Sequence, residues 1–158
     1  AFGFLGGAAL RARAADGSTG NYGIQDQRAA IRWVRANAAV FGGDASALTI
    51  FGQSAGAGSV ANHYVAPNSA GLFRSAIAES GAFSRWNSMP RAIGQWQYEF
   101  LVTSLGCDHP LEQHQVPCLL NKSWELVKEA SSGAPPAWFG LQWAPVVDGV
   151  ALPEEPYF

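Results

Sequence analysis

The chain has 158 residues, a mass of 16.7 kDa and a formal net charge of −2, and 14% of its residues are charged. This length predicts a single domain, although soluble domains usually carry about 25% charged residues. The small negative charge excludes the basic surface that is typical of nucleic-acid binding. No uninterrupted apolar run approaches the ~20 residues of a membrane-spanning helix. The low charge content is consistent with a piece of a larger protein, part of whose surface is covered.

Short stretches of the sequence predict extended chain. Residues 1–5 predict the end of a strand. Residues 48–51 and 75–79 predict buried strands, because they are short, apolar and followed by Gly or Ser. Residues 144–149 predict a further extended segment near the end of the chain.

Helical patterns fill most of the intervals between these strands. The predicted helices span residues 24–41, 57–66, 88–106 and 124–130. Gly42 is expected to end the first helix in a left-handed conformation, and Gly106 is expected to end the third. Ser88 is the expected cap of that third helix, with Pro90 in its first turn. Strands that alternate with helices predict an α/β fold with a mostly parallel sheet.

The most informative pattern is Gly52-Gln53-Ser54-Ala55-Gly56, which lies between a predicted strand and a predicted helix. In a nucleophile elbow the chain turns so sharply that the serine is strained, and glycines two residues away relieve the crowding. The pattern predicts Ser54 as an exposed nucleophile, with Gly52, Gln53 and Gly56 forming the elbow. It also predicts that the N–H of Ala55 contributes to an oxyanion hole. A flexible Gly/Ser turn is the alternative for the pentapeptide alone.

This pentapeptide is one of several short sequence blocks along the chain that together form a recognisable pattern. They are GNYGIQDQR at 20–28, WV at 33–34, FGGD at 41–44, FGQSAG at 51–56, GLFR at 71–74, SG at 80–81, GC at 106–107, CL at 118–119 and PVVDG at 145–149. In this order and spacing they resemble the type-B carboxylesterase family, which includes cholinesterases, bile-salt-stimulated lipases and neuroligins. The resemblance implies a partial α/β-hydrolase fold and a serine ester hydrolase, with Ser54 as nucleophile and Ala55 as a donor to the oxyanion.

The sequence departs from the family pattern beside the serine. Gln53 occupies a position at which many members carry Glu, so one negative charge is missing next to the acyl site. This argues against a strong preference for cationic substrates such as choline esters.

The resemblance also implies that residues 1–158 are the central fragment of a longer domain, truncated at both ends. Within it, residues 1–106 form the sheet and elbow portion, and residues 107–158 form a disulfide loop and an irregular segment. In this fold the triad follows the order serine, acid, histidine. The family's acid and histidine would follow residue 158, and a glycine-rich oxyanion segment would precede residue 1. The fragment alone is therefore expected to be inactive.

None of the three histidines is a good replacement for the missing base. His63 is expected about 13 Å along its helix from Ser54, as a partly buried or solvent-facing residue. His109 and His114 are expected on a surface loop. Asp148 is expected to form a turn rather than to serve as the triad acid.

Cys107 and Cys118, with ten residues between them, could be free core thiols, a metal pair or a disulfide. Their spacing and the histidines between them fit no tetrahedral metal template, so neither a metal site nor a cofactor is expected. The intervening segment is polar and ends in proline, which favours a disulfide that closes a surface loop. The family resemblance also implies a bridge at this position.

A structural disulfide indicates an oxidising compartment. Asn121-Lys122-Ser123 is a glycosylation sequon, which makes Asn121 a glycosylation candidate and is consistent with secretion. The sequence therefore predicts a secreted or ER-lumenal protein.

The leading functional prediction is hydrolysis of small-molecule carboxylic esters through an acyl-enzyme. The alternative is a non-catalytic, cholinesterase-like adhesion or scaffold domain of the neuroligin type. Retention of Ser54 with both elbow glycines favours the enzyme. A truncated product without a folded function is a third possibility, and its exposed strand edges would favour aggregation. The sequence identifies neither the ester nor the oligomeric state.

Overall fold

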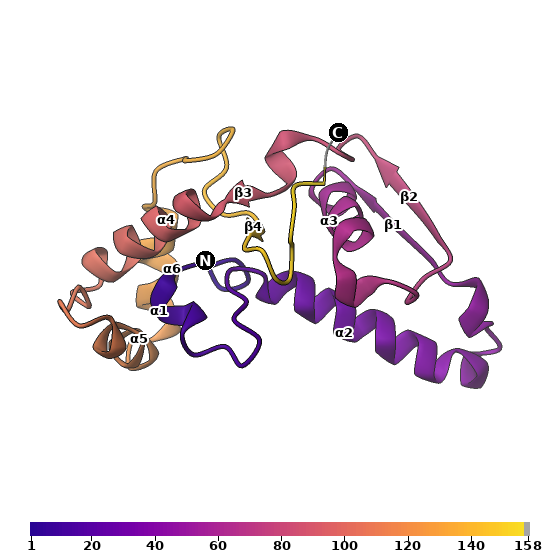
Figure 1. Cartoon of the computed structure of the whole chain (residues 1–158), viewed down its shortest axis with the longest axis horizontal. Helices are drawn as coiled ribbons and strands as arrows, with labels where there is room; N and C mark the ends of the chain where they lie inside the picture. The colour runs from indigo at the N-terminus through magenta and orange to yellow at the C-terminus, as the bar shows by residue number, and fades with distance from the viewer. Residues whose placement is uncertain (157–158) are drawn as a thin grey trace.

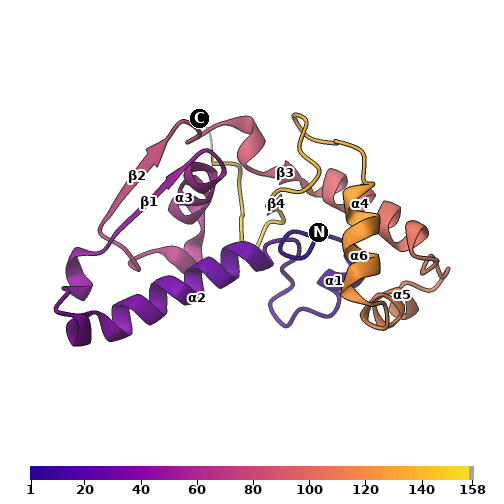
Figure 2. The same cartoon turned by 180° about the vertical axis from the view of Figure 1, so that it is seen from behind.

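The computed structural model describes residues 1–156. Its elements in chain order are α1 (Ala8–Arg11), α2 (Tyr22–Asn37), β1 (Thr49–Gln53), α3 (Ala55–Val65), β2 (Ser75–Glu79), β3 (Met89–Pro90), α4 (Arg91–Ser104), α5 (Glu112–Leu120), α6 (Trp124–Ser132) and β4 (Val146–Val147). Figures 1 and 2 show α2, α3, β1 and β2 gathered at one end, which we call the sheet region. The other end, with α1, α4, α5 and α6, is the helical region. Strands β3 and β4 lie between the two.

Both strand pairs are parallel. Strand β1 pairs with β2 from Thr49↔Ser75 to Gln53↔Glu79, and β3 pairs with β4. The expectation of helices alternating with parallel strands is therefore confirmed. The expected helix cap at Ser88 is wrong, because the chain there is extended and Met89 N donates to Pro145 O at 2.7 Å. Helix α4 consequently begins only at Arg91.

Strands β1 and β2 are less buried than their apolar sequences predicted. Helix α3 packs against both strands. On the remaining surface of the strands, Phe51 is 78% exposed and Ile77 is 53% exposed. The apolar sequence predicts that both faces of the strands are buried. Within residues 1–156, however, side chains such as Phe51 and Ile77 have no such covering layer.

The first residues and the first long helix also depart from expectation. Residues 1–5 form a turn instead of a strand end, because Phe4 N donates to Ala1 O and Gly3 O accepts from Gly23 N in α2. The predicted helix 24–41 is α2 followed by a 3₁₀ turn at Ala38–Phe41. Gly42 ends that turn with a φ of 74°, as predicted.

The helical region has a core of its own around Tyr98, which is 1% exposed. Its ring packs on the backbone of Gly7, where an added Cβ would lie 2.5 Å from the ring. The segment between the cysteines was expected to be a loop, but its second half is helix α5. His114 therefore lies in a helix and not in a loop. Helix α5 forms although it contains Pro117, because it buries Val116 in the core around Tyr98.

Two buried polar side chains join the beginning of the chain to its end. The carboxamide of Asn21 donates to Val146 O at 2.7 Å and accepts from Val146 N at 2.9 Å, so it pairs with the backbone as a strand would. The carboxylate of Asp148 accepts from the backbone N–H groups of Thr19, Val150 and Leu152. Asp148 thus forms a turn, as expected, and it also anchors the segment before α2.

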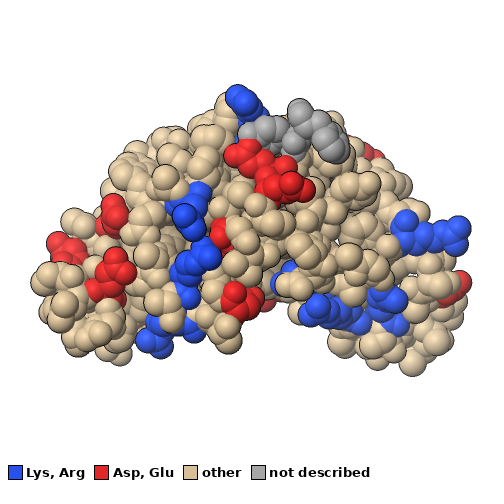
Figure 3. Space-filling model, in the orientation of Figure 1, with Lys and Arg blue, Asp and Glu red and all other residues tan. Residues whose placement is uncertain are grey.

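Charge is sparse on the surface. On the face shown in Figure 3, acidic and basic groups occur in small clusters separated by wide uncharged areas. Within residues 1–156, no helix is both long enough and apolar enough to cross a membrane.

Candidate active site

Ser54 lies between the end of β1 and the start of α3, and its backbone is strained. Its φ of 53° and ψ of −118° are unusual for a residue with a side chain, and such conformations cost about 1–3 kcal/mol. Two hydrogen bonds hold the residue: Ser54 N donates to Glu79 O of β2, and Gly58 N of α3 donates to Ser54 O. The side chain is exposed. The surrounding fold therefore fixes a reactive hydroxyl at the carboxyl edge of the two strands.

The glycines around Ser54 differ in how strictly the structure needs them. A Cβ on Gly52 would lie 2.4 Å from the backbone C atom of Gly56, so only glycine fits at position 52. A Cβ on Gly56 itself would meet nothing within 4 Å, so the expectation that crowding requires glycine at both positions is wrong for Gly56. Gly81 is a second close approach, since an added Cβ would lie 2.7 Å from Ser54 O. Its signal in the sequence was the Ser80-Gly81 pair directly after a predicted strand.

Ala55 begins α3 and is exposed beside Ser54. The first N–H groups of a helix have no partner within the helix, and the helix dipole favours negative charge there. The backbone N–H of Ala55 is therefore available to an oxygen that gains negative charge near Ser54.

A pocket of about 560 Å³ opens next to Ser54, Ala55 and Gly56. Its other lining residues come from several distant segments: Phe4, Gln27, Ser59, Asn62, Trp86, Asn87, Phe139, Leu141, Trp143, Ala144 and Pro145. The sequence did not predict the aromatic side chains of this wall, because they lie far from the serine motif along the chain. No charged side chain and no histidine is among these lining residues, so the pocket suits a neutral, largely apolar molecule.

Gln53, the last residue of β1, is exposed and stands in register with Glu79 of β2. Neighbouring strands lie about 4.8 Å apart, and register partners project to the same face of a sheet. A carboxylate is therefore close to position 53 even though Gln53 itself is neutral.

None of the three histidines lies in the pocket wall. His63 is 4% exposed, so it is more deeply buried than expected. Its Nδ1 lies 2.9 Å from Ser69 Oγ, and its Nε2 lies 3.1 Å from Gln27 Oε1. Burial, assisted by the nearby charge of Arg28, lowers the pKa of His63 to about 4. His109 and His114 lie in the disulfide segment, with ring centroids 4.8 Å apart.

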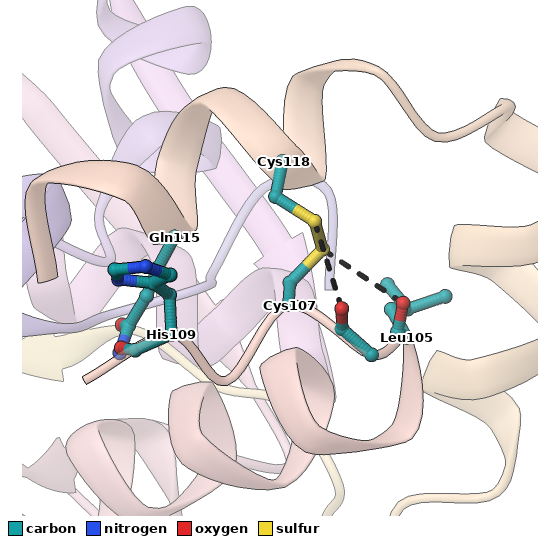
Figure 4. The surroundings of a disulfide bond; sticks show 6 residues. Leu105, Cys107, His109, Gln115 and Cys118 are labelled. Carbon is teal, nitrogen blue, oxygen red and sulfur yellow. Dashed lines mark hydrogen bonds between the residues drawn. A yellow bond between two sulfur atoms is a disulfide. The ribbon is translucent and has the colours of Figure 1, made fainter. Parts of the chain in front are cut away.

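Cys107 and Cys118 form the expected disulfide, with their Cα atoms 5.6 Å apart. Figure 4 shows the bridge joining the start of the segment to α5, with Cys107 Sγ near the carbonyl oxygen of Leu105. Cys118 Sγ also lies near the carbonyl oxygen of Gly106. His109 helps to hold the segment, because its Nδ1 accepts from Leu111 N and its carbonyl accepts from Gln115 Nε2. Within the described residues no group of His, Cys, Asp or Glu side chains could hold a metal ion.

Comparison with known proteins defines the class. The model of the carboxylesterase family matches residues 1–157, and the chain belongs to this family. Its fold is part of an α/β-hydrolase fold, because the chain superposes on a solved PNB esterase with a TM-score of 0.83 and 33% identity. That match covers 98% of this chain and 32% of the PNB esterase chain.

Curated relatives include both enzymes and neuroligins. The chain is 39% identical over 140 residues to acetylcholinesterase of Gallus gallus, which covers 87% of this chain and 18% of that protein. It is 40% identical over 139 residues to neuroligin-2 of Homo sapiens, which covers 87% of this chain and 16% of that protein. The chain thus spans less than a fifth of the length of either relative.

Proposed function

We propose that this chain is the nucleophile-bearing central part of a serine ester hydrolase that cleaves small carboxylic esters through an acyl-enzyme. The observation that carries the proposal is Ser54, which is exposed, has a strained backbone, and lies beside a pocket at the start of a helix. Ser54 Oγ attacks the ester carbonyl carbon, and the N–H of Ala55 donates to the carbonyl oxygen as it becomes negative. The alcohol leaves with a proton, and water then releases the acid from Ser54.

The reaction needs a base that removes the proton from Ser54 Oγ. The described pocket wall contains no histidine and no carboxylate. We therefore assign the triad acid and histidine, and the remaining oxyanion donors, to segments outside residues 1–158. A serine hydroxyl without a base is a weak nucleophile, so the isolated chain is expected to hydrolyse esters little or not at all.

The pocket wall favours neutral esters with an apolar group. The pocket has an apolar surface large enough for an acyl or alcohol chain, and its large apolar side chains include Trp86, Phe139, Leu141 and Trp143. Gln53 adds no charge beside the serine.

Hydrolysis of p-nitrophenyl acetate by the full-length protein tests the proposal. Ser54→Ala should lower kcat by about 10⁴-fold or more, because the nucleophile is lost. Ser104→Ala is the matched control, since Ser104 is exposed at the end of α4, in the helical region. Full activity in Ser54→Ala would refute the assignment.

The similarity to neuroligin-2 supports a second candidate, a non-catalytic adhesion or scaffold domain. A full-length protein that has Ser54 but neither hydrolyses aryl esters nor reacts with fluorophosphonates would favour this candidate. Binding to the surface of cells would then be the property to measure.

We also propose that the protein passes through the secretory pathway and carries an N-linked glycan on Asn121. The disulfide supports this, and Asn121 and Ser123 are both exposed between α5 and α6. Treatment of the secreted protein with an N-glycosidase should convert Asn121 to Asp, which peptide mapping detects. The Asn121→Gln variant should show no such conversion. Ser123→Thr should retain the glycan, and an unmodified Asn121 in secreted material would contradict the site.

A further inference from the structure

Four hydrogen bonds form a continuous chain beside the pocket. It runs from Ser69 Oγ to His63 Nδ1 at 2.9 Å and from His63 Nε2 to Gln27 Oε1 at 3.1 Å. It continues from Gln27 Nε2 to Ser59 Oγ at 3.2 Å and from Ser59 Oγ to Ala55 O at 3.2 Å. This series of hydrogen bonds therefore links α2 to the first turn of α3, which presents Ser54.

The chemistry of the groups gives these bonds one direction. Gln27 Oε1 can only accept, so His63 Nε2 carries the ring proton and Nδ1 accepts from the hydroxyl of Ser69. The amide nitrogen of Gln27 donates to Ser59 Oγ, whose own hydrogen goes to the carbonyl of Ala55. In a chain of this kind each hydrogen bond polarises the next, so the last bond is strengthened by those before it.

The imidazole at the centre of the chain is uncharged at neutral pH. His63 and Ser69 are both buried, and burial is the main cause that lowers the pKa of His63 to about 4. Arg28 on α2 is the charged group that acts on the ring, and it too opposes protonation. The ring can therefore act only as a fixed hydrogen-bonding link and not as a proton acceptor for Ser54.

We propose that Gln27, held in place by His63, is a positioning residue for ester hydrolysis: it fixes the first turn of α3 and so orients Ser54 and the N–H of Ala55. The inference rests on the proposed function of Ser54. Gln27 and Ser59 line the same pocket as Ser54, so the link meets α3 on the side where the substrate would bind. Reacting groups need placement to within about 0.5 Å, and this link adds side-chain hydrogen bonds on the pocket side to the backbone contacts that hold Ser54.

Kinetics of the full-length protein with p-nitrophenyl acetate test the proposal. Gln27→Met removes the amide at similar length, and Ser59→Ala removes the last link. Each should lower kcat five- to tenfold with KM within twofold. Ser59→Thr keeps a hydroxyl that can bond the carbonyl four residues earlier, so it should retain a higher kcat than Ser59→Ala. Ser132→Ala is the control, because Ser132 makes the same kind of bond to Lys128 O in α6, away from the pocket.

The positioning role is wrong if Gln27→Met and Ser59→Ala keep kcat within twofold of wild type. It is also wrong if Ser132→Ala loses as much as Ser59→Ala, because the loss would then reflect helix stability alone.

Nitrogen-15 NMR of labelled histidine gives a reading that does not depend on activity. From pH 5 to 8 the ring of His63 should be neutral and protonated at Nε2, and Gln27→Met should shift the Nε2 resonance. An Nδ1-protonated or cationic ring at pH 6 would overturn the hydrogen-bond direction. If wild type showed no hydrolysis that depends on Ser54, the proposed function would fail, while the NMR reading would still decide whether the link exists.

Discussion

The sheet region and the helical region are stabilised in different ways. The helical region has a disulfide and a core around Tyr98 that buries side chains from α1, α4 and α5. The sheet region has no covalent link among its described residues, and large apolar side chains such as Phe51, Phe41 and Trp33 are exposed there. The candidate nucleophile nevertheless lies in the sheet region, which is held around Ser54 by backbone contacts and hydrogen bonds.

This difference indicates that the reactive geometry and the stability of the chain have separate sources. Close backbone packing at Gly52 and Gly81 sets the conformation of Ser54. The disulfide and the Tyr98 core stabilise a part of the chain that does not line the pocket. Changes in one region should therefore leave the other nearly intact, and the following variants test that separation.

Removal of the disulfide should have the largest effect on stability. The variant with Cys107→Ala and Cys118→Ala should lose about 3 kcal/mol of unfolding free energy, mainly because the unfolded chain gains freedom. Amide hydrogen exchange should rise in α4 and α5 and stay nearly constant in β1 and α3. An equal rise in α3 would contradict the separation of the two regions.

Acid should weaken the sheet region through His63. The folded pKa is about 4 and the ordinary value is 6.5, so between these values the unfolded chain binds more protons than the folded one. Stability should therefore fall as the pH drops from 6.5 to 4, by about 2–3 kcal/mol for this residue. Denaturant unfolding of wild type and His63→Gln at pH 7 and 4.5 measures this difference. Identical pH dependence in both would show that His63 is not held neutral by the fold.

Substitution of the two elbow glycines should have unequal effects. Gly52→Ala places a methyl group against the backbone of Gly56 and should cost about 1–3 kcal/mol. Gly56→Ala has open space and a helical backbone, so it should be neutral or stabilising by about 0.5–1 kcal/mol. Thermal unfolding of both variants decides, and equal losses would show that the close approach is not specific to Gly52.

The charge beside the serine should have the smallest effect. Wild type should show no strong preference for a choline ester over its neutral 3,3-dimethylbutyl analogue. Gln53→Glu should raise that preference about fivefold, equivalent to about 1 kcal/mol. The expected gain is modest because the carboxylate of Glu79 already stands in register with position 53. A hundredfold preference in wild type would contradict the charge argument.

The sequence predicted the elements near Ser54 well, because local signals specify them. A short apolar stretch, a Gly-X-Ser-X-Gly turn and a run of small residues correctly predicted β1, the turn at Ser54 and α3. The disulfide between Cys107 and Cys118 was also predicted, from the polar segment between them and from the family pattern.

Features that depend on distant contacts were not predicted. Strand β3 exists because Met89 pairs with the segment around Val146, and nothing near Met89 in the sequence signals that partner. The same holds for the pocket wall, where Trp86 and Phe139 meet Ser54 only in the folded chain. The hydrogen bonds of His63 were not predicted, because its partners Ser69 and Gln27 lie on different elements.

The most direct test of the central claim is peptide mapping after reaction of the full-length protein with a fluorophosphonate. The tryptic fragment 36–74 contains Ser46, Ser54, Ser59 and Ser69, so fragmentation within it distinguishes the candidate residue from its neighbours. The adduct should lie on Ser54 alone, in step with loss of esterase activity. An adduct on another serine, or an active protein that carries no adduct, would contradict the assignment of Ser54 as the nucleophile.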